Sequence, residues 1–359
     1  MKIGLAAAGS GGHVYPALAV AEALEDLGLA RSDIVFFGGD RMEADTVPAA
    51  GYPFVQVDVH GIRRSLSFEN LTLPVKIWKA TRVIADTVTA EDIRAMVVFG
   101  GYVSGPAGLA ARRRRIPLIV HEANAVPGIA NRMVAPFAES VYVAFERAIT
   151  KLRSAIVVGS PLRSTIENFD RDELAPRARE RYGIHSGATV LGVIGGSLGA
   201  AVLNELATEI ASDVRRAFHI LHLTGAAHHD AMAERAASDP LWTVVPFEDE
   251  MEYFYAASDV VLSRGGAITI SELHATATPA VVVPLSAGKA YQALNACDLV
   301  EAGGVVVISE EDRGEIRDAA VELLANEARR REMSDAVRAT RRTGVARMIG
   351  EHVMEVARD

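Results

Sequence analysis

The sequence contains a single cysteine, Cys297, so it can form neither an internal disulfide nor a metal site built from several cysteines. It also lacks any hydrophobic run near the roughly 20 residues that a membrane-spanning helix needs. The first residues, Met1 to Leu5, lead directly into a strand-like segment, so we expect no cleaved signal sequence. These absences predict a cytoplasmic protein whose contact with a membrane, if it has one, is peripheral.

An excess of positive charge is missing as well. The chain has 37 Lys and Arg residues against 46 Asp and Glu residues, which gives a net charge of −9. Because general nucleic-acid binding needs a clustered positive surface, this balance argues against a nucleic-acid partner. Two local clusters remain, Arg63-Arg64 and Arg112 to Arg115, and either could still meet an anionic surface.

Short apolar runs, by contrast, are abundant and alternate with helix-like segments. The first series includes residues 34–37, 95–99 and 117–120, and a second series includes residues 189–194, 220–223 and 260–262. This alternation predicts parallel sheets covered by helices on both faces. With 359 residues, the chain is also too long for one ordinary core. We therefore predict an α/β fold with two Rossmann-like, doubly wound domains that face a cleft, at residues 1–162 and 163–343.

Three glycine turns join a strand to a helix, at Gly9 to His13, Gly195 to Ala200 and Ser263 to Gly266. Such a turn presents backbone N–H groups and the positive end of a helix dipole, which suits a phosphate or a developing negative charge. His13 adds a group that can carry a proton near neutral pH. The simpler interpretations are tight packing of the turns and a histidine that bonds its local backbone.

A dinucleotide-binding turn fits the first of these poorly. That motif needs a third glycine, where this chain has Val14, and an acid at the end of the second strand, where Asp40 comes two residues late. Neither Gly9 to His13 nor Gly195 to Ala200 is followed by the lysine of a P-loop. Both observations count against an oxidoreductase and a P-loop nucleotidase.

Taken together, several blocks resemble the MurG family of glycosyltransferases over nearly the whole chain. They are Gly9 to Val20, Asp40 to Asp45, Gly100 to Pro106, His121 to Asn124, Gly159 to Arg163, Gly195 to Ala200, Arg264 to Glu272 and Gln292 to Ala296. The resemblance implies the GT-B glycosyltransferase fold, with an acceptor-binding, membrane-side first domain and a second domain that binds a UDP-sugar. It also implies that the terminal helix, residues 344–359, returns to pack on the first domain.

The resemblance carries functional roles onto matching residues. His13 would be the catalytic base, Glu272 would hold the ribose diol, and Phe247 would lie by the uracil. The other residues on the acceptor side would be Ser10, Gly11, Gly12, Tyr102, Ser104, Glu122 and Asn124. The other residues that bind the donor would be Arg163, Ser197, Arg264, Ala267, Ile268, Thr269, Gln292 and Asn295. Without the resemblance, Glu272 could equally be a first-turn acid that the helix dipole stabilises.

The implied reaction is an inverting transfer of N-acetylglucosamine from UDP-N-acetylglucosamine to the C4 hydroxyl of the N-acetylmuramic acid in lipid I, undecaprenyl-diphospho-N-acetylmuramyl pentapeptide. The product would be lipid II, which peptidoglycan synthesis, and hence cell shape and division, requires. We expect no obligatory protein-bound metal and no other cofactor. The one Asp-x-Asp triplet, Asp170 to Asp172, lies in a charged stretch that predicts a solvated helix, and helix N-termini with Arg163 can stabilise the leaving diphosphate.

Three departures from the family pattern lie on the donor-sugar side. Leu198 replaces the usual glutamine, Tyr291 precedes Gln292 where histidine or glutamine is common, and residues 286–290 lack polar and acidic character. They leave two alternatives open. One is a transferase of the same fold with another donor sugar or acceptor, and the other is a catalytically silent protein that binds a nucleotide sugar.

A membrane-surface segment is predicted at residues 66–79, where apolar and aromatic residues mix with lysines. Together with Arg112 to Arg115 it would hold the protein at the anionic cytoplasmic face of the cell membrane. The alternative is a helix that faces the core, beside a solvated run of arginines.

Overall fold

The computed structural model describes residues 1–58, 69–152, 154–196, 198–213, 216–285 and 291–358. The chain divides into two compact units: unit 1, Met1–Arg163 with Gly344–Asp359, and unit 2, Ser164–Thr343. Among the described residues, no helix combines the length and the apolar character needed to cross a membrane.

Unit 1 is built on a seven-stranded parallel sheet with the strand order β3-β2-β1-β4-β5-β6-β7. Its central strands are buried on both faces, which explains why they consist almost entirely of apolar residues. The strands are β1 (Lys2–Ala6), β2 (Ile34–Gly38), β3 (Phe54–Gln56), β4 (Ile93–Val98), β5 (Leu118–Glu122), β6 (Ser140–Val143) and β7 (Ile156–Val157).

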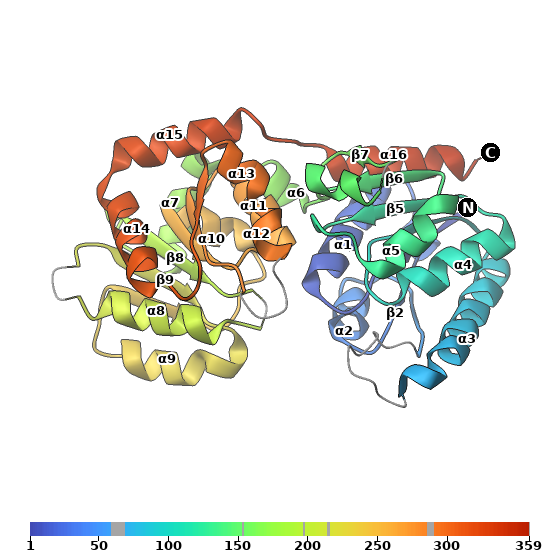
Figure 1. Cartoon of the computed structure of the whole chain (residues 1–359), viewed down its shortest axis with the longest axis horizontal. Coiled ribbons are helices and arrows are strands. Elements are labelled where there is room, and N and C mark those ends of the chain that lie inside the picture. The colour runs from blue at the N-terminus through green and yellow to red at the C-terminus, as the bar shows by residue number, and fades with distance from the viewer. Residues whose placement is uncertain (59–68, 153, 197, 214–215, 286–290, 359) are drawn as a thin grey trace. The chain divides into compact units, whose positions relative to one another are not determined.

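Two layers of helices cover this sheet (Figure 1). Helices α3 (Glu69–Ala90), α4 (Ser104–Arg114) and α5 (Ile129–Val134) pack on one face, while α1 (Gly11–Asp26), α2 (Met42–Ala49) and α16 (Val345–Val356) pack on the other. Helix α16 lies against α1 and buries Val345, Ile349 and Val353, which recur every four residues and so share one helix face. The C-terminal residues thus complete the core of unit 1.

Unit 2 repeats the architecture with a six-stranded parallel sheet in the order β10-β9-β8-β11-β12-β13. The strands are β8 (Val190–Ile194), β9 (His219–Leu223), β10 (Trp242–Val245), β11 (Val260–Ser263), β12 (Ala280–Val282) and β13 (Val305–Val307). The helices are α6 (Ser164–Glu167), α7 (Arg171–Arg181), α8 (Ala201–Ala211), α9 (His229–Ala236), α10 (Met251–Ala257), α11 (Ala267–Thr276), α12 (Tyr291–Asn295), α13 (Cys297–Glu301), α14 (Arg313–Ala325) and α15 (Glu327–Arg338). Two parallel, doubly wound sheets confirm the predicted α/β class.

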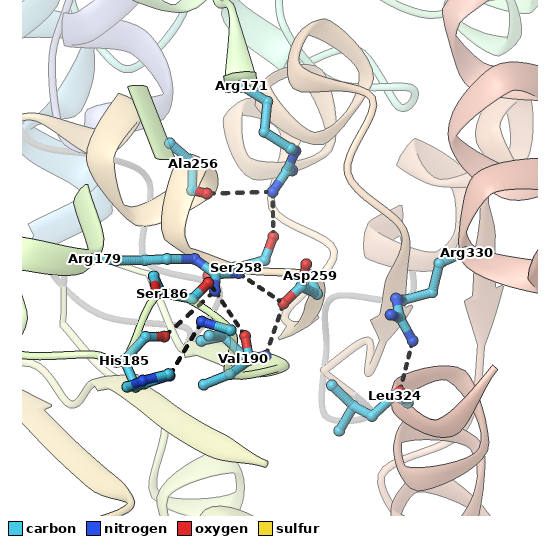
Figure 2. Close-up of polar contacts among 12 residues, drawn as sticks. Arg171, Arg179, His185, Ser186, Val190, Ala256, Ser258, Asp259, Leu324 and Arg330 are labelled. Carbon is cyan, nitrogen blue, oxygen red and sulfur yellow. Dashed lines mark hydrogen bonds and ion pairs between the residues drawn. The ribbon is translucent and has the colours of Figure 1, made fainter. Parts of the chain in front are cut away.

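The Asp170 to Asp172 triplet fastens α7 to the amino-terminal edge of the second sheet (Figure 2). Asp170 caps the helix by accepting the backbone N–H groups of Asp172 and Glu173. Arg171 donates to the Ser258 carbonyl at 2.6 Å, just before β11 begins. The triplet therefore has a structural task at the edge of the sheet opposite the glycine turns.

A second arginine on the same helix closes this edge. Arg179 donates to the carbonyl oxygens of Ser186 and Ala188 and contacts the Asp259 carboxylate at 3.3 Å (Figure 2). Asp259 in turn accepts the N–H of Val190, the first residue of β8. Figure 2 also shows Arg330, which donates to the Leu324 carbonyl near the end of α14.

Both sheets share one topological feature that positions a site. In unit 1, β1 lies between β2 and β4, and in unit 2, β8 lies between β9 and β11, so the strand order reverses direction at these points. Ligands of open α/β sheets bind beyond the carboxyl ends of the strands at such a switch point. The glycine turns after β1, β8 and β11, and the Gly100 to Pro106 segment after β4, all lie there.

Candidate active site

The first glycine turn holds His13 in a defined tautomer. The Nδ1 atom of His13 lies 3.0 Å from the carbonyl oxygen of Ala8 and 3.4 Å from the Ser10 hydroxyl. Because a carbonyl oxygen can only accept, Nδ1 carries the proton in the contact with Ala8, and Nε2 is left as the basic nitrogen. The local backbone bond and a role as a base are therefore compatible, because the bond to Ala8 leaves Nε2 available as an acceptor.

The surroundings of His13 act on its basicity in opposite directions. Burial lowers the pKa of His13 below its usual value, and this effect prevails. The carboxylates of Glu122 and Glu43 oppose it, since negative charge favours the imidazolium. The lowered pKa keeps the ring neutral, and so able to accept a proton, at neutral pH.

Gly100, at the end of β4, makes room for this ring. It has φ +107°, and a Cβ there would lie 2.6 Å from Cδ2 and 2.8 Å from Nε2 of His13. The neighbouring Gly101 has φ +77°, and its Cβ would meet the Ala8 carbonyl oxygen at 2.2 Å. Glycine is required at both positions by conformation and by space.

A buried carboxylate, Glu43 on α2, joins the loops around the turn. Its Oε2 accepts the N–H of Gly9 at 3.1 Å, and its Oε1 accepts the N–H of Gly39 at 3.0 Å and the hydroxyl of Tyr102 at 2.8 Å. We did not single out Glu43 from the sequence, where it has the appearance of an ordinary acid in the first turn of a helix.

A second buried carboxylate, Glu122 at the end of β5, organises the following loop. It accepts N–H groups from the Asn124 backbone and Gly128, both at 2.9 Å, and from the side chain of Asn131 at 3.0 Å. The Asn124 side chain adds a contact of 3.3 Å. Asn131 was also missed, because the asparagine of a short helix carries no pattern in the sequence.

The remaining predicted acceptor-side residues lie at the same edge of unit 1. Ser104 is fully buried, and its hydroxyl accepts the N–H of Gly100 at 2.9 Å, so it closes the turn after β4. Ser10 is the N-cap of α1, and Gly11 and Gly12 are its first residues. The structure thus places these residues at the switch point of unit 1, while Glu122 and Asn124 lie at the end of the next strand, β5.

In unit 2, the turn after β11 opens helix α11. Gly266 is the N-cap, Ala267, Ile268 and Thr269 form the first turn, and Glu272 follows one turn later. The hydroxyl of Tyr255 donates to Oε2 of Glu272 at 2.9 Å and fixes the carboxylate. Burial and the Glu272 charge both raise the pKa of Tyr255, so the phenol remains a donor.

Helix α12 packs against the turn after β11. Asn295 is buried and donates to the Gly265 carbonyl at 3.0 Å, while the Gln292 side chain accepts the N–H of Leu285 at 2.9 Å. A Cβ at Gly265 would lie 2.4 Å from the Gln292 carbonyl oxygen, so the turn and the helix touch through backbone. Both predicted residues of α12 thus have a structural contact beside the candidate donor turn.

Other predicted donor residues have different surroundings. Arg264 forms an ion pair with Glu310 at 2.7 Å and donates to the Val283 carbonyl, which ties β11 to the end of β12. Arg163 belongs to unit 1, where its guanidinium lies 5.3 Å from the ring centre of Tyr15. Phe247 is 43% exposed.

Two of the sequence predictions concern residues that the structure does not describe. Ser197, and the 286–290 segment before Tyr291, lie outside the described residues. Leu198, the departure in the second glycine turn, is 85% exposed, as a residue at an open ligand edge would be. Among the residues that the structure describes, no group of three or more His, Cys, Asp or Glu could hold a metal ion.

Comparison with known proteins gives a consistent result. Residues 3–143 match the glycosyltransferase family 28 N-terminal domain, and residues 190–348 match the family 28 C-terminal domain. A protein of Thermobifida fusca named UDP-N-acetylglucosamine--N-acetylmuramyl-(pentapeptide) pyrophosphoryl-undecaprenol N-acetylglucosamine transferase is 36% identical over 100% of this chain and 95% of its own length. A protein of the same name from Mycobacterium tuberculosis is 40% identical over 86% of this chain and 77% of its own.

Solved structures show the same relation. The crystal structure of Acinetobacter baumannii MurG is 27% identical, with a TM-score of 0.76 over 99% of this chain and 100% of that one. The UDP-GlcNAc 2-epimerase of Neisseria meningitidis, solved with UDP-GlcNAc, shares the fold alone, at 13% identity and a TM-score of 0.70 over 99% of this chain and 100% of its own.

Proposed function

We propose, because the chain belongs to glycosyltransferase family 28, that it transfers N-acetylglucosamine from UDP-N-acetylglucosamine to the C4 hydroxyl of N-acetylmuramic acid in lipid I, which forms lipid II for peptidoglycan synthesis. Relatives that carry the name of this activity match it over its full length. The observation that carries the proposal is the 3.0 Å contact between Nδ1 of His13 and the Ala8 carbonyl oxygen, from which we infer that Nε2 is the basic nitrogen.

The reaction is a single displacement at the anomeric carbon. The acceptor hydroxyl attacks from the face opposite the diphosphate and gives its proton to Nε2 of His13, while the bond to UDP breaks and the electron pair leaves with the diphosphate. The configuration at the anomeric carbon inverts. As His13 becomes charged, the nearby carboxylates of Glu122 and Glu43 stabilise the imidazolium.

Unit 2 is proposed to bind the donor. The N-terminus of α11 offers its first N–H groups and dipole to the diphosphate, with Thr269 in the first turn. Glu272, held by Tyr255, accepts hydrogen bonds from the ribose diol. Phe247 is exposed and can lie against the uracil.

We further propose that no resident metal is needed. The leaving UDP carries negative charge, and the helix N-termini after β8 and β11 supply a fixed positive potential for it. A chelator should leave turnover unchanged within twofold. A complete loss of turnover with chelator, restored by a divalent ion, would contradict this part of the proposal.

The acceptor is a lipid, so we propose that unit 1 binds the cytoplasmic face of the membrane peripherally. In the described part of α3, Val75 and Trp78 are 54% and 55% exposed. Arg82 lies 5.9 Å from the ring centre of Trp78 and Lys79 is exposed, which places positive charge beside the aromatic side chain. Residues 66–68 of the predicted segment lie outside the described residues.

The neighbouring arginine run is only partly available for lipid. Arg114 donates to the Ala85 carbonyl at 2.7 Å and to the Asp86 carboxylate at 2.9 Å, which joins α4 to α3. Arg112 lies over the Phe137 ring at 5.1 Å. Arg113 and Arg115 are exposed and remain the candidates in this run for an anionic headgroup.

The test is a transfer assay with purified protein, a lipid I analogue and a panel of labelled UDP-sugars. Product from UDP-N-acetylglucosamine alone is expected. Transfer from a different UDP-sugar would favour a same-fold transferase, an outcome that the exposed Leu198 in the second glycine turn keeps open. Binding of UDP-sugars without any transfer would overturn the proposal in favour of a silent binding protein.

A further inference from the structure

Glu43 is a buried carboxylate that the reaction described above does not touch directly. It is fully buried, and three neutral groups donate to it: two backbone N–H groups and a phenol. Burying a carboxylate costs free energy even when neutral donors surround it, so neutral donors alone are a poor reason for its presence. The negative charge of the buried Glu43 side chain therefore needs an explanation beyond these three hydrogen bonds.

The three donors belong to three different loops. Gly9 follows β1, Gly39 follows β2, and Tyr102 follows β4. These are three adjacent strands, and their carboxyl ends form the switch point of unit 1. One side chain therefore sets the distances between the glycine turn of His13 and the loops on either side of it.

We propose that Glu43 is a positioning residue for the base, which fixes the Gly9 to His13 turn against Tyr102 and stabilises the positive charge that His13 takes up during transfer. The inference rests on the proposed function, because it assigns His13 the role of base. Glu43 itself contacts neither substrate nor the transferred proton.

The groups that face His13 support an electrostatic role. They are Glu43 from α2, Glu122 and His121 from β5, and the Ala8 carbonyl. Glu122 and Glu43 both raise the pKa of His13 against the effect of burial. His121 stays neutral, since burial lowers its pKa to about 4. The two carboxylates are thus the negative charges that favour the imidazolium.

The variant Glu43→Gln separates charge from size. An amide has one acceptor oxygen, whereas the carboxylate uses both oxygens as acceptors. Whichever way the amide turns, its NH₂ group faces a backbone N–H, from Gly9 or from Gly39. Glu139→Gln is the matched control, because Glu139 is an exposed glutamate in the same unit.

The experiment measures the pKa of His13 by NMR titration and the pH profile of kcat and KM. In Glu43→Gln we expect the pKa of His13 to fall, because one of the two carboxylates that raise it is lost. We also expect kcat to fall about tenfold, with the KM for UDP-N-acetylglucosamine unchanged within twofold. The acid limb of the profile should move to lower pH with the NMR value. Glu139→Gln should match the wild type.

An unmoved His13 pKa in a folded Glu43→Gln protein would overturn the proposal. If that variant does not fold, Glu43→Asp replaces it. It keeps the charge but cannot reach all three donors, so kcat should fall severalfold in the folded protein, and an unchanged kcat would refute the positioning role. The NMR titration needs no turnover. Wild-type protein without transfer activity would therefore refute the proposed function while the coupling of Glu43 to His13 is still measured.

Discussion

At the scale of single residues, His13 is the most informative position in the chain. Replacing it with alanine removes the proposed base but leaves the α11 turn and Glu272 of unit 2 in place. We expect kcat to fall at least about 100-fold, the lower end of what general-base catalysis contributes. The affinity for UDP, measured by calorimetry, should stay within twofold of wild type.

The control for this change is His185→Ala, at an exposed histidine of unit 2. Turnover near the wild-type value in His13→Ala would end the assignment of the base. In the wild type, activity should be lost only on the acid side and below pH 6.5, because the lowered pKa of His13 keeps the ring neutral down to that range.

The sequence made His13, Glu122 and Glu272 candidate site residues because each lies in a block that resembles the family, and their roles stay predictions. It could not identify Glu43, whose partners Gly9 and Tyr102 lie 34 and 59 residues away. Nor could it reveal that Arg264 is paired with Glu310, 46 residues later. Contacts across a sheet depend on the order of its strands, and a local sequence pattern does not reveal that order.

At the scale of elements, the loop after β4 limits the size of the side chain that can lie beside the His13 ring. Gly100→Ala would place a methyl group within 3 Å of the His13 ring at a positive φ. We expect kcat to fall about tenfold or more and the protein to lose about 1 to 2 kcal/mol of stability, the cost of a left-handed conformation. Steady-state kinetics and thermal unfolding measure the two effects.

Gly105→Ala is the matched control for this loop. Gly105 lies in the first turn of α4, and a Cβ there meets nothing within 4 Å. Its activity and melting temperature should equal or slightly exceed those of wild type, because alanine is the better helix former. An active, stable Gly100→Ala protein would show that the ring does not need this space.

Strand and helix positions were largely predictable, since continuous apolar runs and glycine turns mark them directly. The segment 66–79, predicted to lie at a membrane surface with a core-facing helix as the alternative, was harder to interpret. In the structure α3 runs Glu69–Ala90, and it exposes Val75 and Trp78 of that segment, while the residues that it buries, Ala80, Ile84 and Val88, lie beyond it. Binding of this segment to a membrane stays a prediction.

At the scale of the whole molecule, each unit carries a buried neutral histidine. Burial lowers the pKa of His121 in unit 1 and of His222 in unit 2 to about 4, below the usual 6.5. The unfolded chain therefore binds more protons than the folded one below pH 6.5. Stability is full above that pH and is lost as the pH falls toward 4, by about 2 kcal/mol for each histidine at pH 5.

Thermal unfolding at pH 7.5 and pH 5 measures this loss. Since acidic residues also titrate, the comparison needs His222→Gln, whose amide can still donate to the Asn204 side chain as His222 does. The difference in melting temperature between the two pH values should be smaller in that variant. An equal difference would show that His222 does not contribute.

The proposed membrane binding depends on the surface of unit 1, to which α3 contributes Trp78. Trp78→Ser should reduce sedimentation with anionic vesicles at least severalfold and leave the transfer of N-acetylglucosamine to a soluble acceptor analogue unchanged. Val321→Ser, at a partly exposed valine of unit 2, should change neither. Equal sedimentation of the Trp78 variant and the wild type would remove α3 from the proposed membrane surface.

The return of α16 to unit 1 has a consequence for biosynthesis. Five buried residues of the C-terminal segment belong to a core whose other buried members all precede Ser164: Val345, Ala346, Ile349, Val353 and Ala357. The residues of unit 2 therefore leave the ribosome, and can fold, while the side of α1 that α16 will cover is still open to water. The unit that is translated first is completed last, so synthesis that stops before residue 345 leaves an apolar surface for chaperones and proteases to recognise.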